Sequence, residues 1–229
     1  MLKMYDLAGA DASRRFSPYC WRIRMALAHK GLDCEFVPWR FTEKDRIAFS
    51  GQAMVPVLVD GETVVSDSWK IALYLESRYP QNSLFGCETA KAQALFIKHW
   101  VERTLHPLLV RIAVRDIWEL LHEKDQAYFR ESREKRFGMP LEEVPKNREQ
   151  MTVGLRAALD PVRATLEQQP FLCGDSPGFA DYVLFSVLQW ARCATAYPVL
   201  ENSDGVFAYR ERMLDLFGGY ARKAPAAAA

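Results

Sequence analysis

Cysteine is sparse in this sequence and is not arranged as in a metal site or a disulfide-stabilised domain. The cysteines are odd in number and scattered: Cys20, Cys34, Cys87, Cys173 and Cys193. They lack the paired CxxC spacing of a zinc site and the density of a disulfide scaffold. We therefore expect no bound metal, and we interpret most of these thiols as small buried hydrophobic residues.

An excess of one charge and long apolar runs are also missing. The 30 basic and 29 acidic residues leave a net charge of +1, which gives no electrostatic reason to expect nucleic acid or an anionic membrane as a partner. No N-terminal segment has the pattern of a secretory signal, and no window is apolar over the length that a bilayer requires. We therefore expect a cytoplasmic protein that is not attached to a membrane.

Hydrophobic residues, in contrast, are plentiful. They make up 49% of the 229 residues, enough for one large domain or two small ones with a true core. The chain has no internal repeat. It also has no HExxH, GxSxG, P-loop or dinucleotide-binding motif, so these common catalytic classes find no support.

The stretch from Arg14 to Lys30 contains the first candidate site. A short strand before it runs into a loop, and Ser17 followed by Pro18 predicts an N-cap and the first position of a helix. A helix N-terminus has unpaired N–H groups and the positive end of the helix dipole, so an anion such as a thiolate would be stabilised beside Ser17. Taken alone, a serine here is more often a plain cap than a catalyst.

The next part of the chain predicts a second strand and then a hairpin. Residues from Cys34 alternate as a strand, and Val57–Val59 and Thr63–Ser66 flank an AspGly turn, which predicts an antiparallel pair. Pro56 stands where the hairpin begins; it cannot donate to a sheet, so it belongs at a strand start, an edge or a bulge, or after a cis peptide bond. Asp67 or Ser68 would cap the helix that follows.

Everything after residue 80 predicts helices. Pro80–Gly86 has the composition of a linker. Beyond it we expect a long helix over 89–121 kinked at Pro107, a solvated helix end and exposed loop over 124–148, an amphipathic helix over 151–168, and an apolar central helix over 179–194. We therefore predict an α+β protein with a first domain over 1–80, a linker over 81–88 and an all-helical domain over 89–229, with a disordered alanine-rich tail from about residue 224.

Four motifs lie in the order and at the spacing seen in cytosolic glutathione S-transferases, and the chain resembles that family over nearly its whole length. They are SerProTyrCysTrpArg, ValProValLeuValAspGly, AspSerTrpLysIleAlaLeuTyrLeu and PheLeuCysGlyAspSerProGlyPheAlaAspTyr. The first and third look most like the bacterial β-etherase type and its fungal relatives. The resemblance implies a thioredoxin-like βαβ-α-ββα domain, a helical bundle domain, glutathione as co-substrate, a small hydrophobic electrophile and a homodimer.

The resemblance also implies roles for individual residues. Ser17 would be the catalytic serine that favours the glutathione thiolate, and Pro56 would be a cis-proline that exposes the backbone of Val55 to the cysteinyl part. Asp67 and Ser68 would receive the γ-glutamyl end. Many relatives have Lys or Gln shortly before ValPro for the glycine carboxylate; this sequence has GlyGlnAlaMet instead. The candidates for binding the glycine end of glutathione are therefore Gln52, Met54, Arg40 and Lys44.

Two other readings of function stay open. SerProTyrCys is similar to the CysProTyrCys of glutaredoxins with its first cysteine replaced, so Cys20 could act in a glutathione-dependent thiol transfer. The chain could also be a non-catalytic protein that binds glutathione or another ligand.

The sequence says less about the acceptor site, where the second substrate would bind, and about the motif around Asp181. His99, Arg103 and His106 share helical spacing and could line an acceptor site, although a solvated or interdomain face is the simpler interpretation. Arg14 and Arg15 are better placed to meet a substrate. Asp181 is expected to be structural, in a capping box half made because Gly178 replaces Ser or Thr.

Overall fold

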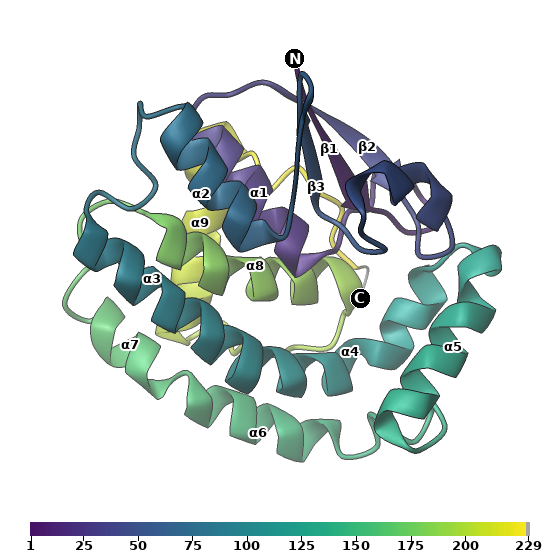
Figure 1. The fold of residues 1–229 in the computed structure, drawn as a ribbon. Coiled ribbons are helices and arrows are strands. Elements are labelled where there is room, and N and C mark those ends of the chain that lie inside the picture. Colours follow the sequence, from purple (N-terminus) through teal and green to yellow (C-terminus); the bar gives the residue numbers. More distant parts are fainter. Residues whose placement is uncertain (228–229) are drawn as a thin grey trace.

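The computed structural model describes residues 1–227 and divides them into a sheet-containing N-terminal domain and a helical C-terminal domain (Figure 1). The first contains β1 (Leu2–Leu7), α1 (Pro18–His29), β2 (Cys34–Trp39), the 3-10 helix η1 (Lys44–Ser50), β3 (Val57–Asp60), β4 (Thr63–Ser66) and α2 (Ser68–Arg78). The second contains α3 (Glu88–Trp100), the π-helical turn η2 (Val101–Leu105), α4 (His106–Leu120), α5 (Glu123–Phe137), α6 (Arg148–Ala158), α7 (Asp160–Leu166), α8 (Phe179–Ala194) and α9 (Gly205–Gly219).

The four strands form one mixed sheet in the order β2-β1-β3-β4. β1 is parallel to β2 and antiparallel to β3, so β1 and β3 are the two inner strands of the sheet. The predicted hairpin is confirmed: β3 pairs antiparallel with β4, and Val57 lies opposite Ser66. Pro56 precedes β3 and follows a cis peptide bond, as the resemblance implied.

The helix α8 joins the two domains. Nearly all of its residues are buried, as expected for a helix that is apolar all round. It packs against α1 on one side and against α3 and α4 on the other, and Figure 1 shows it between these elements. The prediction that this segment lies in the middle of the bundle is therefore confirmed.

The long helix predicted over 89–121 is interrupted. α3 ends at Trp100, η2 follows, and α4 starts at His106, next to Pro107. Proline has no N–H and its ring clashes with the carbonyl four residues earlier, so the regular hydrogen-bond pattern cannot continue through this point. A π-helical turn accommodates the mismatch, and such turns are frequent at functional sites.

The alanine-rich end of the chain begins within the described residues. The Arg192 guanidinium donates to the carbonyl of Ala224, and the N–H of Ala227 donates to the carbonyl of Arg192. Residues 224–227 are therefore held against the end of α8, which differs from the disorder expected there. Residues 228–229 lie outside the described part.

Across residues 1–227, no helix combines the length and the apolar character that spanning a membrane would require.

Candidate active site

A cleft of about 400 Å³ lies where the two domains meet. One wall belongs to the N-terminal domain. It is formed by the ends of β1 and β2, the start of α1 and the segment before β3, and it includes Ser17, Met54 and Val55. The other wall consists of side chains from η2, α4, α5 and α8. We call these the N-terminal wall and the helical wall.

Ser17 is the N-cap of α1 and opens into the cleft. Its backbone is extended (φ −71°, ψ 123°), and its Oγ accepts a hydrogen bond from the N–H of Cys20 at 3.3 Å. Pro18 follows at the start of the helix, where its missing N–H costs nothing. Among the hydrogen bonds of the described residues, Oγ acts only as an acceptor, so its proton can be donated to a group in the cleft.

Cys20 faces away from the cleft. Its side chain is 0% exposed, and burial raises the pKa of its thiol well above the ordinary value. A thiol that is both buried and protonated is a poor nucleophile and cannot reach a disulfide in the cleft. The position of Cys20 therefore favours a packing role.

The segment before β3 presents main-chain groups at the edge of the cleft. The ladders from β3 to β1 and β4 begin at Val57, so Val55 lies beyond the paired part of the strand. Met54 is 71% exposed at the rim. Because Val57 lies opposite Ser66, the start of α2 lies at the same end of the sheet as Val55.

Asp67 and Ser68 have different surroundings at the N-terminus of α2. Asp67 is the N-cap, with Oδ1 accepting from the N–H groups of Trp69 and Lys70 at 3.0 and 3.1 Å. Ser68 is 2% exposed, and its Oγ has no hydrogen-bond partner among the described residues. A buried hydroxyl without a partner is costly, and one at a helix N-terminus is positioned for an anion.

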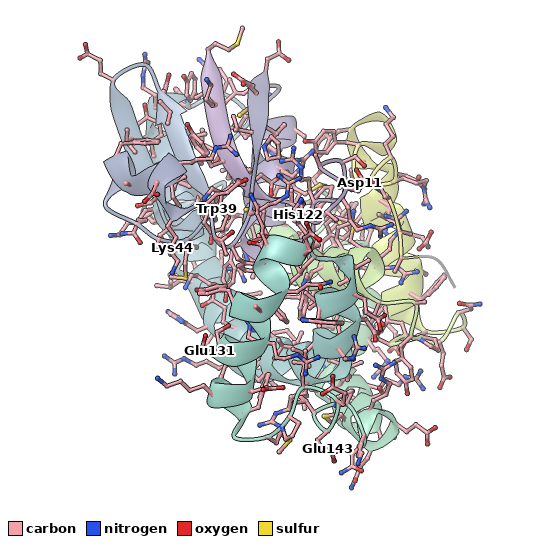
Figure 2. The ribbon with its side chains drawn as sticks, turned by 90° about the vertical axis from the view of Figure 1, so that its right-hand side faces the viewer. Asp11, Trp39, Lys44, His122, Glu131 and Glu143 are labelled. Carbon is pink, nitrogen blue, oxygen red and sulfur yellow. The ribbon has the colours of Figure 1, made fainter. Side chains whose placement is uncertain are left out.

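The structure does not bring the other basic and amide candidates to the cleft. The Arg40 guanidinium donates to the carbonyls of Gly9 and Ala10. Gln52 is exposed beside the segment that reaches the cleft. Lys44 lies with its Nζ 4.7 Å from the ring centre of Tyr128 in α5; Figure 2 shows Lys44 and Trp39 on the side of the N-terminal domain that faces this helix.

Four rings lie in the helical wall. His106 stacks on Trp190 with ring centres 5.2 Å apart and planes 26° apart. Tyr128 and Phe129 of α5 also line the cleft. Of the three residues that share helical spacing on the long helix, His106 lines the cleft. His99 and Arg103 are exposed, which agrees with the simpler interpretation of a solvated face.

The pKa of the His106 imidazole is lowered to about 4. Burial is the main cause, the positive charges of Arg136 and Arg22 lower the pKa as well, and the negative charge of Glu102 opposes them. The ring is therefore neutral near neutral pH.

The expectation that 124–148 is only a solvated helix end and an exposed loop is wrong for α5. Tyr128, Phe129, Arg133 and Arg136 all line the cleft. The signal was present in the sequence: an adjacent aromatic pair inside a charged helix, with a basic residue four positions after Phe129, predicts an aromatic and basic helix face.

Arg14 and Arg15, expected to be placed to meet a substrate, hold the fold instead. The Arg14 guanidinium donates to the carbonyls of Cys193 and Ala226 at 3.1 and 3.0 Å. Arg15 forms an ion pair with the fully buried Asp6 at 3.6 Å.

A buried ion pair connects the two walls. Arg22 of α1 has a side chain that is 1% exposed, and its Nη1 lies 2.6 Å from Oε1 of Glu102 in η2. Lys98 contacts the other carboxylate oxygen at 2.9 Å. Although burial raises the pKa of Glu102, the hydrogen bonds from Arg22 and Lys98 lower it overall. Glu102 therefore stays charged and fastens the π-helical turn to α1.

Asp181 is structural, as expected. Its carboxylate accepts hydrogen bonds from the N–H groups of Gly178, Leu172 and Cys173. The capping box is only half made, because Gly178 has no side chain to accept a hydrogen bond from the helix. A Cβ there would lie 2.8 Å from the sulfur of Cys173, so a larger residue would require Cys173 to move.

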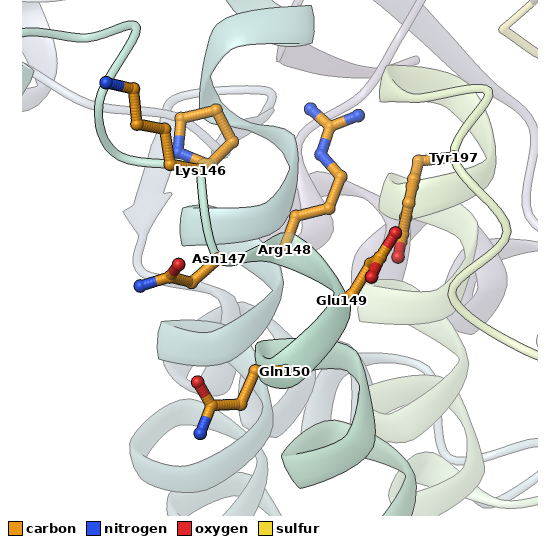
Figure 3. A pocket seen from close by; sticks show the side chains of 7 residues that line it. Lys146, Asn147, Arg148, Glu149, Gln150 and Tyr197 are labelled. Atoms are coloured by element: carbon orange, nitrogen blue, oxygen red, sulfur yellow. The ribbon is translucent and has the colours of Figure 1, made fainter.

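A second hollow of about 360 Å³ lies at the start of α6 (Figure 3). It is lined by Pro145–Gln150 and Tyr197. Arg148 there is committed to an ion pair with Asp116 and a stack on Tyr197. Within residues 1–227, no group of three or more His, Cys, Asp or Glu residues is arranged to hold a metal ion.

Comparison with known families matches both domains. Residues 13–83 match the model "Glutathione S-transferase, N-terminal domain", and residues 92–204 match "Glutathione S-transferase, C-terminal domain". The zeta class glutathione S-transferase of Euphorbia esula is 38% identical over 95 residues, 39% of each chain. The glutathione S-transferase-like protein ustS of Aspergillus flavus is 33% identical over 55% of this chain and 49% of its own. These matches span two fifths to one half of the relatives' own length.

Solved structures cover almost the whole chain. Glutathione transferase GSTFuA3 of Phanerochaete chrysosporium aligns with a TM-score of 0.77 and 26% identity, over 97% of this chain and 93% of its own. A glutathione S-transferase of Ceriporiopsis subvermispora, in complex with glutathione, aligns with a TM-score of 0.83 and 20% identity, over 99% of both chains.

Proposed function

Because this chain belongs to the glutathione S-transferase family, we propose that it is a glutathione transferase in which Ser17 activates the thiol of glutathione. The thiolate attacks a small hydrophobic electrophile, aromatic or an aryl ether of the β-etherase kind. The observation that carries this proposal is the Ser17 hydroxyl, which caps α1 and opens into the cleft between the domains with its proton uncommitted.

The start of α2 supports glutathione as the ligand. The partnerless Oγ of Ser68 and the adjacent helix N-terminus suit the γ-glutamyl carboxylate. Asp67 uses Oδ1 for capping, and its second oxygen is left for the ammonium group. The main chain of Val55 pairs with the cysteinyl part, next to Pro56. The fungal neighbour named above in complex with glutathione has the same fold.

The chemistry follows from the position of Ser17. A free thiol has a pKa of about 8.5, and a hydroxyl donor at a helix N-terminus lowers it, so more thiolate is present at neutral pH. The sulfur forms a bond to the electrophilic carbon, and the leaving group departs with the electron pair of the bond that breaks. For an aryl ether the leaving group is a phenolate.

The glycine end of glutathione lies toward Gln52 and Met54, which precede Val55 in the chain. Arg40 and Lys44 are the other candidates, but Arg40 would first have to release the carbonyls of Gly9 and Ala10, and Lys44 lies against the ring of Tyr128. The first two residues are therefore favoured over Arg40 on geometry.

We also propose a homodimer. The helix α3 exposes Phe96, with 70% of its surface accessible, beside Leu95, and large exposed apolar side chains are typical of surfaces that a partner covers. Light scattering on the purified protein measures the assembly directly.

The test of the function is turnover. Purified protein is incubated with glutathione and an aryl halide, an aryl ether or an isothiocyanate, and consumption of the thiol is followed. We expect turnover that Ser17→Ala lowers while glutathione affinity, measured by calorimetry, stays nearly constant. Ser13→Ala is the matched control, because Ser13 lies in the preceding loop and bonds only to Asp11. Glutathione binding without turnover of any of the three electrophiles would replace the enzyme with a non-catalytic carrier.

Thiol transfer has its own test. Cys20→Ser keeps all activity if Cys20 is only packed in the core, and loss of activity in a correctly folded Cys20→Ser variant would restore the glutaredoxin-like alternative.

A further inference from the structure

Arg133 is a half-buried cation in the helical wall. Its guanidinium carbon lies 4.3 Å from the ring centre of Phe129 and 5.3 Å from that of Phe41. It lines the same cleft as Ser17. A guanidinium stacked on aromatic faces keeps its in-plane N–H groups available at the edge, and a planar anion can accept two of them.

No carboxylate neutralises Arg133 among the described residues. The ion pairs of residues 1–227 do not include Arg133 or Arg136, and the hydrogen bond that Arg133 makes is to the hydroxyl of Ser132 at 2.9 Å. Arg130, one turn earlier on the same helix, pairs with both Glu134 and Glu142. Burial also lowers the pKa of Arg133, and the nearby charge of Arg136 lowers it as well.

The remaining ionisable groups of the cleft leave this charge uncompensated. Glu102 is already bonded to Arg22 and Lys98. His106 is neutral near neutral pH. Arg136 adds a second positive charge that is felt by both His106 and Tyr19. The cleft therefore combines aromatic walls with a net positive potential.

We propose that Arg133 selects acceptors that carry an anionic group, a carboxylate above all, on an aromatic or apolar body. The inference rests on the proposed transferase function and names the class of its second substrate. Arg133 binds the anionic group through its edge N–H groups, Arg136 strengthens the field, and the aromatic side chains of the wall hold the body of the acceptor.

Glutathione itself has a carboxylate that Arg133 could bind, at its glycine end. The location of Arg133 favours the acceptor instead. Arg133 belongs to α5 in the helical wall, with Tyr128 and Phe129 beside it, whereas the groups that suit glutathione lie at the ends of β3 and β4 in the other domain. Binding of the acceptor's anionic group and binding of the glycine carboxylate of glutathione give different kinetic results.

The test compares two electrophiles that differ by one carboxylate on the ring, a neutral chlorodinitrobenzene and a chlorodinitrobenzoate, each normalised to its uncatalysed rate with glutathione. Arg133→Leu is expected to lower kcat/KM for the benzoate about tenfold, the value of one charge-assisted hydrogen bond. The neutral acceptor should change less than about twofold, and the KM for glutathione should stay constant. Arg133→Lys, which keeps the charge without the fork, should recover part of the loss.

Arg111→Leu is the matched control. Arg111 also stacks on a phenylalanine, with its guanidinium 5.0 Å from the ring of Phe137, but it is exposed and lies outside the cleft. Its replacement should leave the ratio between the two acceptors unchanged.

Two results would overturn the inference. One is an unchanged benzoate-to-neutral ratio in a folded Arg133→Leu variant. The other is a raised KM for glutathione with both acceptors alike, which would assign Arg133 to the glycine carboxylate.

Binding of dinitrobenzoate, which lacks the leaving group, is measured separately by quenching of tryptophan fluorescence and compared with binding of dinitrobenzene. If dinitrobenzoate binding depends on Arg133 but no electrophile is turned over, the inference about Arg133 stands and the transferase function is refuted. If the neutral acceptor is turned over but dinitrobenzoate binds equally well without Arg133, the transferase function stands and the inference is refuted.

Discussion

The two walls of the cleft are built in different ways. The N-terminal domain offers groups that the backbone positions. The capping hydroxyl of Ser17 and the residue Val55 line the cleft, and the hydroxyl of Ser68 lies at a second helix N-terminus, at the same end of the sheet but outside the lining of the cleft. The helical wall offers side chains from four separate elements, among them four rings and two arginines that form no ion pair within residues 1–227. Backbone-positioned groups suit one constant ligand, whereas side chains on helices can change without disturbing the sheet. We infer that activation and substrate choice are separated between the two domains.

The largest expected effect comes from breaking the link between the walls. Glu102→Leu leaves Arg22, 1% exposed, without a carboxylate, and an uncompensated buried charge costs about 3 kcal/mol. The free energy of unfolding in urea should fall by that amount. Glu119→Leu is the control, since Glu119 pairs with Arg115 on the surface at 2.9 Å and should cost less than about 0.5 kcal/mol. Equal effects of the two substitutions would mean that the link contributes nothing.

The next effect tests the N-terminal wall alone. Ser17→Ala should lower kcat with a neutral electrophile about 100-fold, the usual cost of one donor aimed at a reacting anion. The loss should shrink as pH rises, because the thiol then ionises without help. The measurement is a pH–rate profile of both proteins with the same acceptor. A uniform loss at every pH would show that Ser17 acts on something other than ionisation of the thiol.

A smaller effect distinguishes glutathione binding from thiol activation within the N-terminal domain. Ser68→Ala should raise the KM for glutathione about tenfold and leave kcat nearly unchanged, because it removes one hydrogen bond to a charged group. Without glutathione, the variant should unfold at the same or a higher urea concentration, since the lost hydroxyl is buried without a partner. A clear loss of stability in the free variant would give Ser68 a structural partner and weaken its assignment to glutathione.

The smallest effect concerns the helical wall. The pKa of His106 is about 4 when folded, and the unfolded chain binds this proton at a higher pH, near ~6.5. Stability should therefore be complete above the unfolded value and decline as pH falls toward the folded value. Between about pH 7 and about pH 5.5 the loss should be on the order of 1 kcal/mol, and His106→Phe, which keeps the stack on Trp190, should lose less. Identical pH dependence of the two proteins would mean that His106 is not the responsible group.

Local signals were enough to predict most of the fold. The Ser17–Pro18 start, the hairpin across AspGly and the cap at Asp67 each depend on neighbouring residues, and each appears in the structure. The central position of α8 followed from its apolar character alone. The cleft side of α5 could not be predicted in the same way, because its role depends on which face the packing of α5 against the N-terminal domain turns toward Ser17.

Prediction from the sequence meets the same limit for the roles of individual residues. Arg14, Arg15 and Arg40 are basic residues near the expected site, but they hydrogen-bond to carbonyls or pair with buried Asp6. Nothing in their spacing reveals those acceptors, which come from distant parts of the chain. Ser68, in contrast, was predictable by position, although only the structure reveals that its hydroxyl is buried and has no hydrogen-bond partner within residues 1–227.

The most direct test of the central claim is a crystal structure of the protein with glutathione. We predict that the glutathione sulfur lies within hydrogen-bond reach of Ser17 Oγ, that its γ-glutamyl carboxylate meets Ser68 and the start of α2, and that the helical wall is left open for the acceptor. A sulfur more than about 4 Å from Ser17 Oγ would contradict the catalytic assignment, because hydrogen bonds are shorter than that.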